Sequence, residues 1–259
     1  MAVTIDMSGK AVVVTGGGKG VGRGISGRFL EAGASVLVCG RTAPEALPEA
    51  AGRKADFLEL DLKEAGAAEG LISEAVSRYG RVDVVVNNAG GSPFADAATA
   101  SPRFSESIIR LNLLVPLYVA QQANSVMQEQ EEGGVVLNIA SVSADRPSPG
   151  TAAYGAAKAG LLSLTRTLAV EWAPKVRVVA VTAGMVKTEQ SELHYGDEEG
   201  LARVSATVPL GRMAGPRDVG DVCVFAASPL ASYISGASLL VHGGGEKPAF
   251  LDAATGVKR

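Results

Sequence analysis

The chain has 259 residues, of which 47% are hydrophobic and 20% charged, a composition that excludes a disordered chain and allows one sizeable core. Its 24 basic and 27 acidic residues give a formal net charge of −3, so the basic excess of nucleic-acid-binding proteins is missing. Two cysteines, Cys39 and Cys223, provide no disulfide framework, which predicts a reduced, cytoplasmic protein.

The sequence also lacks the patterns of a targeting or membrane segment. The first ten residues include Asp6 and no apolar core, unlike a secretory signal. Residues 222–245 carry no formal charge, but Ser228, Pro229, Gly236 and His242 interrupt them, so no continuous apolar span of about 20 residues exists there. We expect no membrane association.

Short apolar runs alternate along the chain with longer segments of helical spacing. The runs predict strands at residues 11–14, 36–38, 55–60, 82–86, 135–139, 176–181 and 239–241. The segments between them predict helices at residues 22–32, 63–78, 105–128, 154–172 and 216–227. Unbroken apolar strands that alternate with helices predict an α/β fold, a doubly wound parallel sheet with helices on both faces. No linker or repeat divides residues 1–259, so we predict a single domain.

Residues 186–207 depart from this pattern because they are polar and lie between a strand and the next helix. We expect them to form a substrate lid at the carboxyl end of the sheet, where ligands bind in such folds. His194 and Tyr195 of this segment could meet a substrate, although solvated positions are the simpler expectation.

A glycine-rich loop, residues 15–22, follows the first predicted strand and precedes a helix. Glycines there allow a sharp turn, let a diphosphate approach bare backbone and let the helix pack closely, while the helix N-terminus attracts an anion. The pattern G-x-G-x-x-G is met only by Gly22, Gly24 and Gly27, which lie inside the predicted helix, so we regard that match as coincidental. A purely structural turn would use the same glycines.

The end of the second predicted strand bears on the choice of nucleotide. A carboxylate that would bind the adenosine ribose of NAD is missing, and Arg41 stands there instead. Arg41, with Lys19 in the glycine loop, suits the 2′-phosphate of NADP(H), which we predict is preferred over NAD(H). The alternative is that both cations are solvated surface residues.

Tyr154 and Lys158 are spaced to lie one turn apart on one face of a helix. A neighbouring ammonium ion favours the phenolate, so we expect Lys158 to lower the pKa of Tyr154 toward the range of an acid or base. Ser141 follows a predicted strand and could donate to a carbonyl oxygen. Asn112 offers an amide that could hold a water or fix the lysine, or could be a structural polar group.

The ordered motifs resemble those of the short-chain dehydrogenase/reductase family over essentially the whole chain. Residues 15–22 resemble its cofactor loop, Asp61-Leu62 its adenine contact and residues 87–90, Asn-Asn-Ala-Gly, the motif after its fourth strand. The family's catalytic tetrad falls on Asn112, Ser141, Tyr154 and Lys158. Thr188 matches its contact to the nicotinamide carboxamide.

The resemblance implies a Rossmann-type sheet of about seven parallel strands and a role for each tetrad residue. Tyr154 would exchange the substrate proton, Ser141 would polarise the carbonyl, Lys158 would bind the nicotinamide ribose and Asn112 would support a water-linked proton relay. The expected cofactor-binding residues are Gly16, Gly18, Lys19, Gly20, Val21, Gly22, Arg41, Thr42, Asp61, Leu62, Asn88, Ala89, Gly90, Tyr154, Lys158, Gly184, Val186 and Thr188. Two departures are Ala183 where the family usually has proline, which could loosen entry to the lid, and Gly91 where a bulkier residue is frequent, which could open the wall beside the nicotinamide.

These expectations define an NADP(H)-dependent oxidoreductase that interconverts a carbonyl and a secondary alcohol of a small molecule. A 3-oxoacyl-thioester (acyl-carrier-protein) reductase would use the same motifs. A non-catalytic NADP-sensing or scaffold protein is the alternative of another class. The resemblance also suggests a homo-oligomer, a tetramer or dimer, while His242 lacks the neighbouring ligands that a metal site needs.

Overall fold

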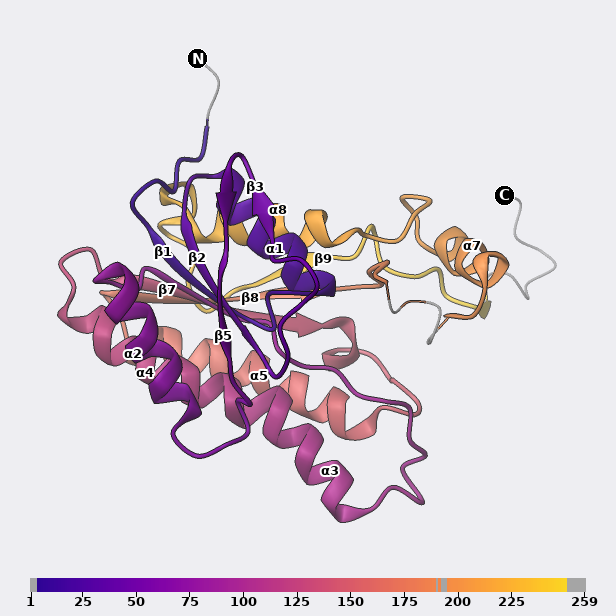
Figure 1. Cartoon of the computed structure of the whole chain (residues 1–259). Coiled ribbons are helices and arrows are strands. Elements are labelled where there is room, and N and C mark those ends of the chain that lie inside the picture. Colours follow the sequence, from indigo (N-terminus) through magenta and orange to yellow (C-terminus); the bar gives the residue numbers. More distant parts are fainter. Residues whose placement is uncertain (1–3, 190, 192–194, 251–259) are drawn as a thin grey trace.

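The computed structural model describes residues 4–189, 191 and 195–250, and its centre is a seven-stranded parallel sheet (Figure 1). Across the sheet the strands follow the order β5-β2-β1-β6-β7-β8-β9. Their bounds are β1 Ala11–Thr15, β2 Ser35–Gly40, β5 Asp56–Glu59, β6 Val84–Asn87, β7 Gly134–Ser141, β8 Val176–Ala183 and β9 Ser238–Val241. All seven predicted strands are present and parallel, which confirms the predicted doubly wound sheet.

Helices cover both faces of the sheet, α1 and α8 on one and α2, α4 and α5 on the other (Figure 1). Their bounds are α1 Gly20–Glu31, α2 Ala67–Tyr79, α3 Pro102–Ile109, α4 Val115–Glu129, α5 Ala152–Glu171, α7 Glu198–Thr207 and α8 Pro216–Ala227. Within β1, Val12 and Val14 face the α1–α8 core whereas Val13 faces the other core. Burial on both faces explains why the strands read as unbroken apolar runs.

The predicted helix over residues 105–128 is divided in the structure. It consists of α3, a π-helical turn at Arg110–Leu114 and α4. Pro116 has no N–H to donate to the carbonyl four residues earlier, so regular α-helical bonding cannot run through this point. A further element missed by the sequence pattern is the hairpin of β3 Glu49–Ala50 and β4 Arg53–Lys54.

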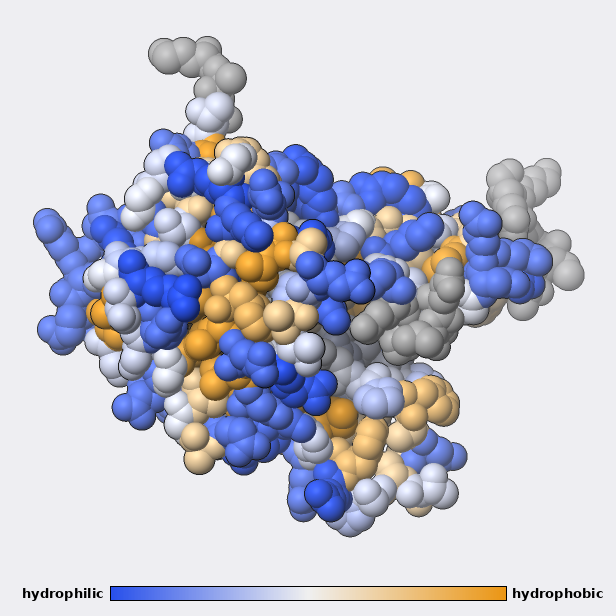
Figure 2. All heavy atoms as spheres, viewed as in Figure 1, coloured by the Kyte–Doolittle hydropathy of each residue, from blue (hydrophilic) through white to orange (hydrophobic). Residues whose placement is uncertain are grey.

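Polar side chains cover most of the face shown in Figure 2, and an apolar band crosses it over the β5 edge of the sheet. The β5 residues Phe57 and Leu58 are half-buried, as expected for an edge strand. Among the described helices, none combines the length and hydropathy needed to cross a membrane.

Candidate active site

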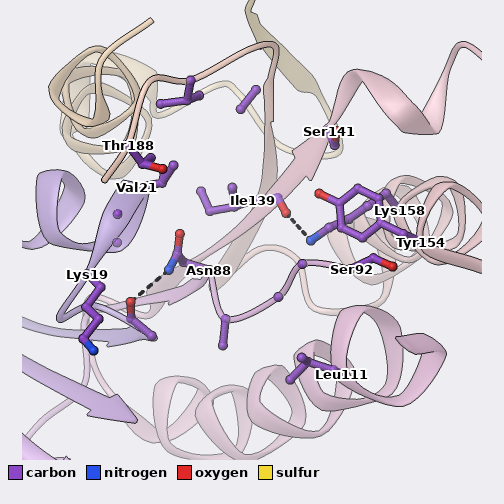
Figure 3. A pocket seen from close by; sticks show the side chains of 18 of the residues that line it. Lys19, Val21, Asn88, Ser92, Leu111, Ile139, Ser141, Tyr154, Lys158 and Thr188 are labelled. Carbon is purple, nitrogen blue, oxygen red and sulfur yellow. Dashed lines mark hydrogen bonds between the residues drawn. The ribbon is translucent and has the colours of Figure 1, made fainter. Parts of the chain in front are cut away.

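A cavity of about 760 Å³ lies at the carboxyl ends of the strands, beside the point between β1 and β6 where the strand order reverses. It runs from the glycine loop to Tyr154 (Figure 3). The predicted site residues that line it are Gly16, Lys19, Gly20, Val21, Gly22, Arg41, Asp61, Leu62, Asn88, Ala89, Gly90, Ser141, Tyr154, Lys158, Gly184, Val186 and Thr188. Gly18, Thr42 and Asn112 do not line it.

The glycine loop leaves bare backbone toward the cavity. Gly16 and Gly20 have positive φ values of 63° and 51°, which side-chain-bearing residues rarely adopt. A Cβ on Gly22 would stand 2.3 Å from the Gly16 carbonyl oxygen, so this glycine lets α1 pack against the loop. Gly18 instead faces Pro44. The N-cap of α1, Lys19, provides no side-chain cap, and the first helical turn contains no acidic residue. The loop therefore presents the positive end of a helix to the cavity, as a diphosphate group requires.

Gly24, from the coincidental motif match, serves helix packing. A Cβ on Gly24 would lie 2.4 Å from Pro216 of α8, and one on Gly220 of α8 would lie 2.8 Å from the Gly24 carbonyl oxygen. Both glycines allow α1 and α8 to cross closely, away from the cavity.

The Asn-Asn-Ala-Gly motif is attached to the glycine loop through Thr15. The Thr15 hydroxyl accepts hydrogen bonds from the backbone N–H groups of Asn88 (3.0 Å) and Ala89 (2.9 Å). The Asn88 amide in turn donates to the Thr15 carbonyl (2.9 Å) and the Gly16 carbonyl (3.3 Å), next to the cavity (Figure 3). These bonds hold the ends of β1 and β6 together across 73 residues of sequence.

Cations gather at the end of the cavity near β2. Arg41 is exposed and forms no ion pair with any described residue, and Lys19 and Lys63 also line the cavity. The carboxylate of Asp61 also lies there, but its Oδ1 accepts from the Lys63 backbone N–H (3.0 Å) and thus caps a turn. This end therefore offers positive charge to an anionic group.

Ser141, Tyr154 and Lys158 meet at the opposite end (Figure 3). Helix α5 carries Tyr154 and Lys158 one turn apart, and the Lys158 Nζ lies 5.6 Å from the centre of the Tyr154 ring. Lys158 is only 3% exposed, and its Nζ donates to the Ile139 carbonyl of β7 at 2.8 Å. Figure 3 shows the Tyr154 hydroxyl and the Lys158 amine turned toward the same cavity. The predicted spacing on one helix face is confirmed.

The structure changes the expected electrostatics of this pair. Burial raises the pKa of Tyr154, and a hydrogen bond with the Ser141 side chain lowers it by less. The predicted lowering of the Tyr154 pKa is therefore wrong for this structure, because desolvation of the phenolate is the largest effect and the opposing one comes from Ser141. The same burial lowers the pKa of Lys158 to about 8. Tyr154 is thus a neutral phenol at pH 7, ready to give a proton, and Lys158 remains mostly an ammonium ion.

Asn112 lies behind the cavity wall, in the π-helical turn, and is fully buried. Its Oδ1 accepts from the Gly91 N–H (2.9 Å), and its Nδ2 donates to the carbonyls of Gly91 (3.0 Å) and Ile108 (2.9 Å). Its side chain therefore fixes Gly91, rather than holding Lys158 as one of the sequence interpretations suggested.

Several residues at the Tyr154 end were not found from the sequence. The hydroxyls of Ser143 and Ser148 lie 3.1 Å apart, and those of Ser148 and Thr151 lie 2.7 Å apart. These three residues line the cavity with Tyr195 and with Phe94, which is 77% exposed. Their position directly after Ser141 and before Tyr154 was the available signal for the hydroxyl group, whereas Phe94 lies in a loop without a recognisable pattern.

Both departures from the family pattern are at the cavity. Gly91 has φ 126°, and an added Cβ would meet nothing within 4 Å, in agreement with the predicted opening of the wall. Ala183 ends β8, where it is paired in register with Ser141 and Val241.

The predicted lid, residues 186–207, begins along the cavity and ends in α7. Thr188, Glu189 and Tyr195 line the cavity, while residues 190 and 192–194, including His194, lie outside the described residues.

Comparisons with known proteins agree with this geometry. A family model described as "Enoyl-(Acyl carrier protein) reductase" matches residues 16–246. The protein named "Probable 2,4-dienoyl-CoA reductase" of Bacillus subtilis (strain 168) is 36% identical over 248 residues, which cover 92% of this chain and 97% of the relative.

Two solved structures share the fold over almost their whole length. The ligand-free aldohexose dehydrogenase of Thermoplasma acidophilum has a TM-score of 0.87, 27% identity and 99% coverage of each chain. A candidate NAD(P)-dependent gluconate 5-dehydrogenase of Beutenbergia cavernae, with NADP bound at low occupancy, has a TM-score of 0.83 and 33% identity, with 93% of this chain and 98% of that chain covered.

The chain belongs to the short-chain dehydrogenase/reductase family. It is an oxidoreductase that uses a nicotinamide cofactor and interconverts a carbonyl and an alcohol. The cavity described above supplies bare backbone at one end and a half-buried Tyr154 beside the buried Lys158 at the other, as that chemistry requires.

Proposed function

We propose that the protein is an NADP(H)-dependent reductase of a small carbonyl compound, with Tyr154 as the proton donor. The observation that carries this proposal is one continuous cavity. The cations Lys19 and Arg41 lie at its end near β2, here called the outer end, and the Tyr154–Lys158 pair lies at the opposite, inner end. When bound, the nicotinamide group supplies or accepts the hydride.

In the proposed mechanism, each residue at the inner end has one task. The Ser141 hydroxyl donates to the substrate carbonyl oxygen and orients it toward Tyr154. Tyr154, kept neutral by burial, gives its proton to that oxygen as negative charge develops. The Lys158 ammonium ion stabilises the phenolate that remains and binds the nicotinamide ribose. Asn112 fixes the Gly91 wall and supports a water-linked relay that returns a proton.

The cofactor would lie along the glycine loop and the Asn88–Gly90 segment. The bare backbone of Gly16 and Gly20 and the start of α1, whose N-cap residue makes no side-chain cap, fit a diphosphate. Lys19 and Arg41 fit a 2′-phosphate, which favours NADP(H) over NAD(H), and the Beutenbergia relative binds NADP. Gly18 and Thr42 remain proposed cofactor contacts although they do not line the cavity.

NADPH absorbance with a panel of ketones, quinones and acyl thioesters tests the proposal. Oxidation of NADPH by a member of the panel supports it. No oxidation of NADPH by any member of the panel, despite tight NADPH binding, would favour the sensor or scaffold alternative.

An acyl-thioester reductase is the second candidate, because the matching family model and the Bacillus relative are both named for thioester substrates. Faster turnover of a 3-oxoacyl thioester than of the matching free ketone would favour it.

We also propose a homo-oligomer in a reducing compartment such as the cytoplasm. Both cysteines are buried and unpaired, and Val170, at 80% exposure, and Tyr233 are apolar residues on the surface. Light scattering on the eluting protein would distinguish a tetramer, a dimer and a monomer.

A further inference from the structure

We propose that Glu189 is an internal competitor of the cofactor diphosphate and thereby sets the cofactor affinity. Its carboxylate accepts a hydrogen bond from the backbone N–H of Gly20 at 2.9 Å, across 169 residues of sequence. Gly20 is the first residue of α1, so the carboxylate stands at the positive end of that helix. The inference rests on the proposed function because the competing ligand is its cofactor.

The start of α1 offers no other anion for this position. Its N-cap residue makes no side-chain cap and its first turn has no acidic residue. An uncapped helix start attracts a carboxylate or a phosphate through the same N–H groups and the same dipole. Glu189 and a diphosphate are therefore alternative occupants of one place.

The loop that carries Glu189 is held in this position at both of its ends. Before Glu189, the backbone N–H of Lys187 donates to the Ala214 carbonyl (2.8 Å), and the backbone N–H of Ala214 donates to the Met185 carbonyl (3.0 Å). After it, the buried Ser191 hydroxyl accepts from the Thr188 N–H at 2.7 Å. Thr188 would also be within 4 Å of a Cβ placed on Gly20. Two neighbouring residues of the loop, Thr188 and Glu189, therefore lie at the start of α1.

This contact couples cofactor binding to the segment after β8. A diphosphate that reaches the start of α1 must replace the Glu189 carboxylate, since two anions at one N–H group repel each other. The replaced side chain releases the loop at its contact with α1, while the hydrogen bonds that join Lys187, Ala214 and Met185 remain. Competition with Glu189 therefore lowers the affinity for the cofactor. The lower affinity favours exchange of the used cofactor for a fresh one.

Nucleotide binding to Glu189→Ala and Glu189→Gln tests the proposal, with Glu198→Gln as the control. Glu198 is an exposed acid at the start of α7, and its replacement changes the net charge equally. The probes are NADP⁺, ADP and adenosine 2′-monophosphate, of which only the first two contain a diphosphate. Isothermal titration calorimetry measures the three dissociation constants.

We expect Glu189→Ala to bind NADP⁺ and ADP roughly two- to fivefold more tightly. Glu189→Gln keeps the oxygen but loses the charge, so a gain of about twofold is expected. Adenosine 2′-monophosphate should bind equally to all proteins, and Glu198→Gln should match the wild type. In the nucleotide-free protein, Glu189→Ala should also increase amide hydrogen exchange in the first turn of α1.

Unchanged or weaker binding of NADP⁺ and ADP by Glu189→Ala would overturn the inference. Equal tightening of adenosine 2′-monophosphate, or an equal effect of Glu198→Gln, would reduce it to a general charge effect and also overturn it. If the wild-type protein bound none of the three nucleotides, the proposed function itself would fall, and the inference with it.

Discussion

The two ends of the cavity are built in different ways. At the inner end, Tyr154 and Lys158 project from a long helix, and Lys158 is buried and bonded to the Ile139 carbonyl. At the outer end, Arg41 and Lys19 are exposed side chains near loops. The inner end is therefore fixed by packing of the core, whereas the outer end depends on surface charge. Changes at the inner end should act on chemistry and stability, and changes at the outer end on nucleotide choice.

The sharpest separation of the two ends is expected from Tyr154→Phe. Loss of the proton donor should lower kcat by about 10³-fold, within the usual range for general acid catalysis, while NADPH affinity stays within about twofold. Stopped-flow turnover and fluorescence titration measure the two quantities. Tyr118→Phe, which removes a surface hydroxyl, is the control and should change neither. Comparable turnover in Tyr154→Phe would remove Tyr154 from the mechanism.

Lys158→Met should stabilise the fold at pH 7 while it reduces turnover. Burial lowers the Lys158 pKa from 10.5 to about 8, so the charged amine destabilises the folded state below pH 8. The expected gain in the free energy of unfolding is on the order of 1–3 kcal/mol, after the lost bond to the Ile139 carbonyl.

The pH dependence of that gain has a definite sign. Between about pH 8 and 10.5 the unfolded chain binds the proton that the folded protein has released, so wild-type stability rises with pH through this window. The difference in the free energy of unfolding between Lys158→Met and the wild type should become smaller from pH 7 to pH 10. Urea denaturation at both values checks this, with the exposed Lys54→Met as control. A gap that does not change with pH would contradict the burial argument.

At the outer end, Arg41→Asp should weaken NADPH binding about tenfold and leave NADH binding within about twofold, because only the 2′-phosphate meets the new charge. Dissociation constants for both cofactors give the ratio directly. Arg103→Asp, on the exposed start of α3, is the matched control. An unchanged preference between the two cofactors would exclude Arg41 as its source.

The sequence predicted the sheet and the inner end well because both depend on local spacing. Buried parallel strands leave apolar runs, and a tyrosine four residues before a lysine on a helix must share its face. The direction of the Tyr154 pKa shift could not be predicted, since it depends on how deeply distant elements bury the phenol. The contact of Glu189 with Gly20 joins segments 169 residues apart and leaves no periodic signal.

The smallest expected effect concerns the predicted lid, which joins the two ends of the cavity. If residues 186–207 close over bound ligands, NADPH should slow amide exchange in α7 severalfold, because its N–H groups would open to solvent less often. Exchange in α8, which packs on α1, should not change and serves as the internal reference. Equal exchange in α7 with and without cofactor and substrate would mean that this helix takes no part in closure. Among the described residues of that segment, Val186, Thr188, Glu189 and Tyr195 would then be the ones that shape the cavity.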